Sequence, residues 1–245
     1  MKIELKGINR KYFGHEAIKD FNWTINLKEG LVHGLIGPNG AGKTTVLKIL
    51  SGIFKFESGD ILIDGIDSDY ASWARENISF IAAGERGIRF TNTVFDNVIY
   101  FSELKGFDIE NTKLLYEKYS DILNANDLRD VKVGSLSTGQ KKKASLLCAL
   151  CSNSRIIILD EPSDGLDISA KVDLENIIKD IASNSQTNFI ISTHDIDFIS
   201  PVANAYTFVN NGKNAYDYNG FMENKFIKDK FLELKESAKW GELWV

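Results

Sequence analysis

Residues 37–45 read GPNGAGKTT and directly follow the apolar run 31–36. An apolar strand that ends in a glycine-rich loop and continues into a helix is typical of a phosphate-binding loop, or P-loop. The glycines Gly37, Gly40 and Gly42 allow the backbone amides to approach phosphate groups, and the N-terminus of the helix adds the positive end of its dipole. The stretch therefore predicts nucleotide binding.

Four further residues of this loop are candidate ligands. Lys43 is expected to reach the β and γ phosphates, and the Thr44 hydroxyl is expected to bind Mg²⁺. Asn39 and Thr45 lie in the same stretch and are also expected to bind the nucleotide.

A second apolar run ends in two acidic residues. Residues 156–161 read IIILDE, so Asp160 and Glu161 stand at the exit of an expected strand. Asp160 is a candidate metal ligand, and Glu161 lies one residue further toward the γ phosphate. A carboxylate in that place suits a general base that polarises the attacking water.

Residues 136–140 read LSTGQ and precede an apolar helical pattern. Ser137 and Gln140 have the spacing of a capping box, which favours a well-capped helix start. A capped N-terminus that also carries Gly139 can offer its amides and its dipole to a second phosphate group.

Composition narrows the class of protein. The 245 residues are 43% hydrophobic and 26% charged with a net charge of −5, which disfavours nucleic-acid binding through bulk positive charge. The first residues lack the apolar stretch of a secretory signal, and no run approaches the roughly 20 apolar residues that span a bilayer. Cys148 and Cys151 are spaced to share one helix face and are expected to be buried thiols.

The pattern along the chain predicts an α/β fold. Residues 1–26 alternate apolar and polar positions, as in a half-buried antiparallel sheet. Continuous apolar runs at 31–36, 156–159 and 188–192 indicate parallel strands covered on both faces. Helical patterns at 44–51, 141–151 and 170–183 lie between them and complete a mixed core with a parallel sheet.

Three segments stand apart from this core. Residues 94–130 are helical in period and rich in charge, and are interpreted as a helical insertion. Residues 206–218 contain a hairpin signal around an Asn-Asn-Gly-Lys turn. The tail 221–245 carries Phe226, Ile227, Phe231, Leu232 and Leu234 at helical spacing; docking on the domain is favoured over a membrane-interface role for its Trp240 and Trp244.

These motifs together resemble the nucleotide-binding domains of ABC (ATP-binding cassette) proteins. GPNGAGKTT resembles their P-loop, LSTGQ their signature, LDEP at 159–162 their Walker B strand and SDGLD at 163–167 their D-loop. The resemblance implies the ABC ATPase fold of P-loop NTPases, with ATP and Mg²⁺ as cofactors. It implies one domain: a core of 1–85 and 137–220 that includes the antiparallel part, a helical subdomain of 86–136, and the tail.

The resemblance also assigns roles to further residues. Tyr12 looks like the aromatic residue that stacks on adenine, against the alternative of a surface tyrosine. His194, in STHD, looks like the switch histidine that contacts the γ phosphate and fixes the attacking water. Asp167 resembles the D-loop aspartate of the dimer interface and can also cap the following helix.

The sequence departs from the family pattern in one loop. Most members carry a glutamine that links metal and water to the helical insertion, but residues 80–87 read FIAAGERG. The expected position falls on Gly84, and the adjacent Glu85 is a candidate replacement as a metal ligand, against the alternative of a solvated loop carboxylate. The Glu85–Arg86 pair resembles a subset of ABC-2-type exporter ATPases.

The family's signature faces the P-loop of an opposite subunit, so the resemblance implies a dimer of identical or related chains around two ATP molecules. Ser137, Gly139 and Gln140 of one chain would then complete the site of the other. A separate transmembrane permease is the expected partner, which places the chain peripherally at the cytoplasmic face of the membrane, and export is the preferred direction. A soluble ABC ATPase of assembly or repair, and a regulator without useful turnover, are the alternatives.

Overall fold

The apolar runs form the centre of a six-stranded sheet in this computed structural model, which describes residues 1–67, 69–84 and 87–241, with side chains as far as residue 236. The strand order is β10-β9-β3-β8-β7-β6, and all neighbours are parallel except the antiparallel pair of β9 and β10. Every residue of the three central strands is buried. The strands are β3 (Val32–Ile36), β6 (Ile78–Ile81), β7 (Ile156–Asp160), β8 (Asn188–Thr193), β9 (Ala205–Asn210) and β10 (Lys213–Asn219).

The order of the central strands places the sequence motifs side by side. Strands β3, β8 and β7 are adjacent and parallel, so their carboxyl ends meet at one edge of the sheet. The P-loop follows β3, Glu161 follows β7, and His194 follows β8. Ligands of open α/β sheets bind at this edge.

A second, antiparallel sheet has the order β2-β1-β4-β5 and packs over helix α1 (Lys43–Leu50) and one face of the central sheet, with which it shares a hydrophobic core. The alternating apolar residues Ile3, Leu5 and Ile8 are its buried face. Its strands are β1 (Lys2–Tyr12), β2 (His15–Asn26), β4 (Ser58–Ile63) and β5 (Ile66–Asp67), with α2 (Tyr70–Asn77) following.

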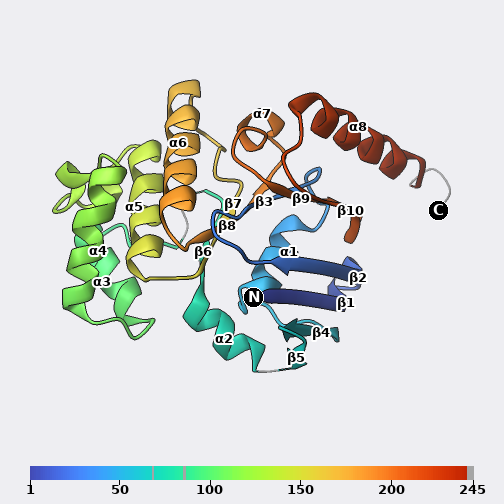
Figure 1. Ribbon diagram of the computed structural model, residues 1–245, viewed down its shortest axis with the longest axis horizontal. Coiled ribbons are helices and arrows are strands. Elements are labelled where there is room, and N and C mark those ends of the chain that lie inside the picture. Colours follow the sequence, from blue (N-terminus) through green and yellow to red (C-terminus); the bar gives the residue numbers. More distant parts are fainter. Residues whose placement is uncertain (68, 85–86, 242–245) are drawn as a thin grey trace.

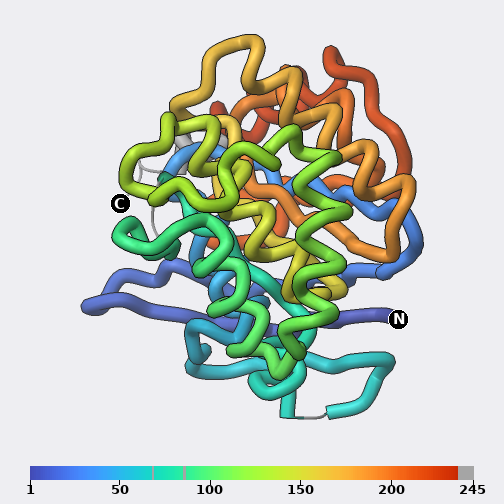
Figure 2. The backbone as a smooth tube through the Cα atoms, turned by 90° about the vertical axis from the view of Figure 1, so that its left-hand side faces the viewer, coloured from blue at the N-terminus to red at the C-terminus, as the bar shows by residue number. Residues whose placement is uncertain are grey.

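Helices α3 (Val94–Glu103), α4 (Ile109–Ile122) and α5 (Thr138–Cys151) lie at the end of the molecule away from the antiparallel sheet (Figure 1). They pack against one another, and Figure 2 shows the backbone from their side. The remaining elements are η1 (Asn126–Leu128), η2 (Val133–Ser135), α6 (Ile168–Asn184), α7 (Ile196–Ile199) and α8 (Asn224–Gly241). None of the described helices combines the length and apolar composition that a bilayer crossing requires.

The tail helix α8 docks on the domain, as the sequence predicts, but with fewer residues than expected. Ile227 is buried, and Phe231 and Leu234 pack against the same core. The prediction is wrong for Phe226 and Leu232, whose side chains are exposed, because they lie outside the stripe that faces the core. The side chain of Trp240, and Trp244 as a whole, lie outside the described residues.

Most of the other predicted elements are confirmed, including the hairpin of β9 and β10 and the two buried cysteines, which are free thiols. The sequence analysis did not predict β4, β5, β6 or α2. These elements are short, at two to eight residues; β4 and β6 carry mixed burial patterns and both residues of β5 are exposed.

Candidate functional site

The P-loop joins β3 to α1 and is held tightly against β2. Gly42 caps α1 with a φ of 104°, and a Cβ atom there would lie 2.8 Å from the Ile18 side chain and 2.9 Å from the Ala17 carbonyl oxygen. Any larger residue would push the loop off the strand. Asn39 and Gly40 lie exposed at the tip of the loop, where a phosphate can reach their backbone amides.

Lys43 is buried, with 5% of its surface exposed, and its ammonium group has three partners. Its Nζ donates to the carbonyl oxygens of Gly37 at 2.8 Å and Pro38 at 3.2 Å, and lies 3.0 Å from Glu161 Oε1. The ion pair neutralises two charges that would be costly to bury separately. A phosphate that binds Lys43 must therefore displace one of these contacts, of which the Glu161 carboxylate is the other anion.

Both carboxylate oxygens of Glu161 have partners, and its backbone adopts a strained conformation. Its Oε2 accepts hydrogen bonds from the His194 amide at 3.2 Å and lies 3.0 Å from His194 Nδ1, while Oε1 faces Lys43. Its φ of 47° lies in the left-handed region, which costs a residue other than glycine about 1–2 kcal/mol. Strained backbone of this kind concentrates at functional sites, where the surrounding structure maintains it.

The donor set at Thr44 and Asp160 suits Mg²⁺. The Thr44 hydroxyl lies 2.9 and 3.1 Å from the two oxygens of the Asp160 carboxylate, so one hard alcohol oxygen and one carboxylate converge. Magnesium prefers such oxygen ligands and usually completes its shell with water and substrate phosphates. Thr45 follows in the first turn of α1 and is half-buried.

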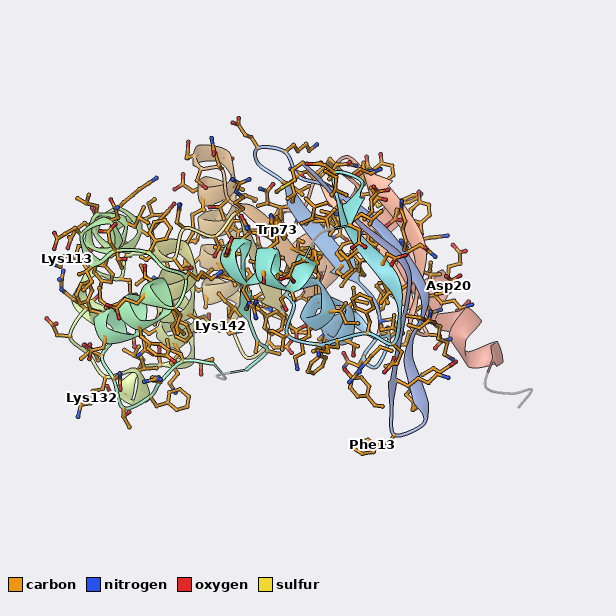
Figure 3. The ribbon with its side chains drawn as sticks, turned by 90° about the horizontal axis from the view of Figure 1, so that it is seen from below. Phe13, Asp20, Trp73, Lys113, Lys132 and Lys142 are labelled. Carbon is orange, nitrogen blue, oxygen red and sulfur yellow. The ribbon has the colours of Figure 1, made fainter. Side chains whose placement is uncertain are left out.

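The candidate adenine residue Tyr12 ends β1, in the hairpin whose second strand supports the P-loop. Its ring is half-buried, packs edge to face with Phe54 at 6.0 Å between centroids, and has the Arg10 guanidinium 4.9 Å from its centroid. Its hydroxyl is buried without a hydrogen-bond partner in the described structure. Figure 3 shows the neighbouring Phe13 at the tip of this hairpin.

The signature residues lie at the start of α5. Ser137 and Gln140 form a reciprocal capping box: Ser137 N donates to Gln140 Oε1 at 3.0 Å, and Gln140 N donates to Ser137 Oγ at 3.3 Å. This confirms the capping prediction. Gly139 is half-buried, yet no heavy atom of the described residues lies within 4 Å of the position a Cβ would occupy, so this side of the helix start is open to them.

Lys142, labelled in Figure 3, ties the same helix to the D-loop. Its Nζ donates to the carbonyl oxygens of Asp164, at 2.7 Å, and of Pro162. Burial lowers the pKa of Lys142 below its usual value. Asp167 caps α6 by accepting a hydrogen bond from the Ala170 amide at 2.8 Å, which confirms the capping part of its predicted role.

The candidate metal ligand Glu85 lies outside the described residues. The preceding Gly84 has a φ of 75°, and none of the described residues comes within 4 Å of its Cβ position. A small cavity of about 60 Å³ separates this loop from Asp160 and Glu161.

Sequence reasoning missed three features of the site. It did not predict the direct ion pair of Lys43 with Glu161, the left-handed backbone at Glu161, or the hydrogen bonds of Ser192, which lies two residues before His194. A small polar residue at the end of an otherwise apolar strand was the available signal for Ser192.

The comparisons with known proteins define the family. The model described as "ABC transporter" matches residues 19–164, which is more than half of the chain. The chain therefore belongs to the ABC transporter family, and it is an ABC ATPase, the ATP-binding and ATP-hydrolysing component. The fold predicted from the resemblance is confirmed.

Individual relatives agree with this assignment. The putative ABC transporter ATP-binding protein PF0068 of Pyrococcus furiosus is 32% identical over 215 residues, covering 86% of this chain and 81% of that protein. The structure of cbiO1 from Clostridium perfringens, part of the transporter complex cbiONQ, has a TM-score of 0.79 at 26% identity and covers 98% of both chains. The cassette MJ0796, solved as a dimer with ADP and Pi, shares the fold with a TM-score of 0.76 at 22% identity, covering 89% of this chain and 98% of that one.

Proposed function

We propose that this chain hydrolyses ATP at the edge of the central sheet, with Glu161 as general base, and thereby drives a separate membrane permease. The observation that carries the proposal is the convergence of Lys43, Glu161 and His194, whose reactive groups are linked at distances of about 3 Å. The groups come from three separate loops at one sheet edge.

The ion pair suggests how the base becomes available. When a γ phosphate occupies the P-loop, Lys43 turns its ammonium group from Glu161 Oε1 to the phosphate oxygens. Glu161 stays oriented because His194 holds its other oxygen. The free Oε1 then accepts a proton from the attacking water, whose oxygen bonds to the γ phosphorus as the bond to the ADP oxygen breaks.

Thr44 and Asp160 are the residues that would hold Mg²⁺, since their oxygens already converge. Magnesium supplies charge neutralisation for the phosphates when bound. Asn39, Gly40, Gly42 and Thr45 contribute backbone amides and the start of α1 to the phosphate site.

Two chains would share each ATP. At Gly40 in the P-loop and Gly139 in the signature, the part of the chain that the structure describes leaves the Cβ side uncovered. A second chain that presents its Ser137, Gly139 and Gln140 to this P-loop would close the site, as the sequence resemblance implies.

The division into a core of 1–85 and 137–220, a helical subdomain of 86–136 and a tail is part of the same proposal.

A groove of about 420 Å³ between β6, α3, α5 and the end of α1 supports a site for the permease. Ile53 and Leu104 line it with 55% and 64% of their surface exposed, so two large apolar side chains are available to a partner in one groove. Arg75 and Lys105 also line it, and no carboxylate is among its described lining residues. We assign to it an amphipathic segment of the permease that presents apolar side chains and a carboxylate.

Replacing Leu104 with Asp tests this assignment. The introduced charge should abolish capture of the permease from native membranes, because binding of the permease segment would remove water from the new carboxylate in a largely apolar groove. Leu114→Asp is the matched control: Leu114 is 70% exposed on α4 and does not line the groove. Equal capture by the two variants contradicts the assignment.

Export is the finer part of the proposal and rests on the Glu85–Arg86 pair in the sequence. Transport into inverted membrane vesicles tests it, and a permease that takes up its cargo into right-side-out vesicles overturns it. A permease partner would also place the chain at the cytoplasmic face of the membrane.

The hydrolytic part of the proposal is tested by Glu161→Gln. ATP turnover should fall by about 10²- to 10⁴-fold, the usual worth of general acid-base catalysis. Nucleotide affinity should rise, because an uncharged amide competes less well for Lys43 than a carboxylate does. Glu110→Gln is the control, because it removes a carboxylate that pairs with Lys113 on the exposed face of α4, and it should keep turnover; near-normal turnover in Glu161→Gln removes Glu161 from the base role.

A further inference from the structure

A buried serine contacts both the Asp160 carboxylate and the backbone amide of Glu161. Ser192 belongs to β8, has 0% of its surface exposed, and is the register partner of Asp160 across the parallel ladder. Its Oγ lies 2.5 Å from Asp160 Oδ1 and 3.0 Å from the backbone nitrogen of Glu161. The hydroxyl donates to the carboxylate and accepts from the amide, so one group contacts both residues.

We propose that Ser192 is a positioning residue for ATP hydrolysis, which aims the Asp160 carboxylate at the metal and stabilises the left-handed backbone of Glu161. The inference rests on the proposed function and adds a residue to its machinery. Ser192 acts through its neighbours, because it is fully buried behind them and reaches no open part of the P-loop.

The bond to Asp160 matters most when the site is loaded. In the structure the carboxylate accepts hydrogen bonds from both Thr44 and Ser192. A metal ion held by Thr44 and Asp160 would occupy oxygen lone pairs and leave both hydroxyl protons in place, so Ser192, on the strand beside β7, would continue to fix one carboxylate oxygen of Asp160. A carboxylate without such a partner can rotate, and its oxygen leaves the ligand position.

The bond to Glu161 acts on the backbone. The Glu161 amide is shared between the carbonyl oxygen of Ser192 at 3.1 Å and its hydroxyl at 3.0 Å. The carbonyl contact belongs to the strand and survives removal of the side chain. The hydroxyl supplies the second acceptor at a residue whose φ of 47° is strained.

Ser192→Ala removes the hydroxyl with almost no change in volume, and Ser192→Thr retains it. The control is Ser102→Ala, which loses a similar bond, since Ser102 is also 0% exposed and its Oγ lies 2.5 Å from Thr112 Oγ1 in the helical part. The probe is Mn²⁺, whose binding to the full chain with a non-hydrolysable ATP analogue is followed by electron paramagnetic resonance. Thermal unfolding of each variant is recorded alongside.

Ser192→Ala should bind Mn²⁺ about 10- to 100-fold more weakly, the worth of one hydrogen bond to a charged group, while affinity for the analogue without metal stays unchanged. Its turnover at saturating Mg²⁺ should also fall, and Ser192→Thr should recover metal affinity. Metal affinity of Ser192→Ala within about twofold of the wild type, or an equal loss in Ser102→Ala, overturns the proposal. A wild-type chain that binds Mn²⁺ and analogue without hydrolysing ATP defeats the proposed function, yet the metal affinities still decide the role of Ser192.

Discussion

At the scale of single residues, the core contains an imidazole that burial keeps uncharged at neutral pH. His33 in β3 is 3% exposed, its Nε2 lies 2.8 Å from Thr207 Oγ1, and its ring packs edge to face with Trp23. Burial lowers the pKa of His33 from 6.5 to about 3. Between these values the unfolded chain binds a proton that the folded chain does not, so stability rises with pH in this window and is lost as the pH falls.

His33→Gln should flatten this acid dependence. Glutamine can keep a hydrogen bond to Thr207 but has no proton to gain, so the slope of unfolding free energy against pH between 6.5 and 3 should decrease by up to about 1.4 kcal/mol per pH unit. Urea unfolding at several pH values measures the slope. The control is His15→Gln, since His15 is exposed at the start of β2; equal slopes in the His33 variant and the wild type contradict the prediction.

The residues of the site were more predictable than their contacts. Lys43, Asp160 and Glu161 follow from motifs, because phosphate and metal chemistry restricts the residue types at fixed spacing. The ion pair of Lys43 with Glu161 could not be predicted, because it depends on the distance between loops that follow two different strands. For the same reason the contact of Ser192 with Asp160 could not be predicted, since the two residues are 32 positions apart in the sequence.

At the scale of elements, the turn between β9 and β10 supports the P-loop. Gly212 N donates to the Ala41 carbonyl oxygen at 2.9 Å, and the Gly212 carbonyl oxygen accepts from Lys19 N at 2.9 Å. The turn thus connects the P-loop to β2. A Cβ atom at Gly212 would lie 2.5 Å from the Ala17 carbonyl oxygen, and its φ is 73°.

Gly212→Ala should destabilise the fold by about 2–4 kcal/mol, because backbone strain and a clash with backbone act together. ATP affinity should also fall several-fold, since the P-loop loses its support. Gly106→Ala separates the two causes: Gly106 has a φ of 77° but open space around it, so only strain applies. Denaturant unfolding and nucleotide titration are the measurements, and equal effects of the two variants would refute the role of the turn.

Helices and strands with a strong local sequence pattern were predicted, and those that form mainly through pairing with neighbouring strands were not. The central strands are mostly apolar and fully buried because both faces of the sheet are covered, and a capping box marks the start of α5. Strand β5 has two residues, both exposed, and exists through its pairing with β4. Strand β6 is half-buried at the edge of the central sheet, where a periodic signal is weak.

At the scale of the whole molecule, the proposed site is incomplete in one chain. The P-loop tip and the signature helix start both lie open at Gly40 and Gly139, so neither can enclose a nucleotide alone. Closed point-group symmetry favours a twofold dimer, in which each chain gives its P-loop to one site and its signature to the other. ATP would then act as part of the interface, and its hydrolysis would release the pair.

Mixing two inactive variants tests this shared site in a dimer of identical chains. Lys43→Ala removes the phosphate ligand and Ser137→Arg blocks the signature, so each variant alone should have no intact site and almost no turnover. In a mixed dimer, the P-loop of the Ser137→Arg chain meets the intact signature of the Lys43→Ala chain, which restores one site of two. Half of randomly formed dimers are mixed, so ATPase activity should recover to about a quarter of the wild-type value. Mixing Lys43→Ala with Glu161→Gln is the control, because both changes affect the same half and their mixed dimer has no complete site; recovery there equal to that of the first mixture, or none in either, would exclude a site shared between identical chains.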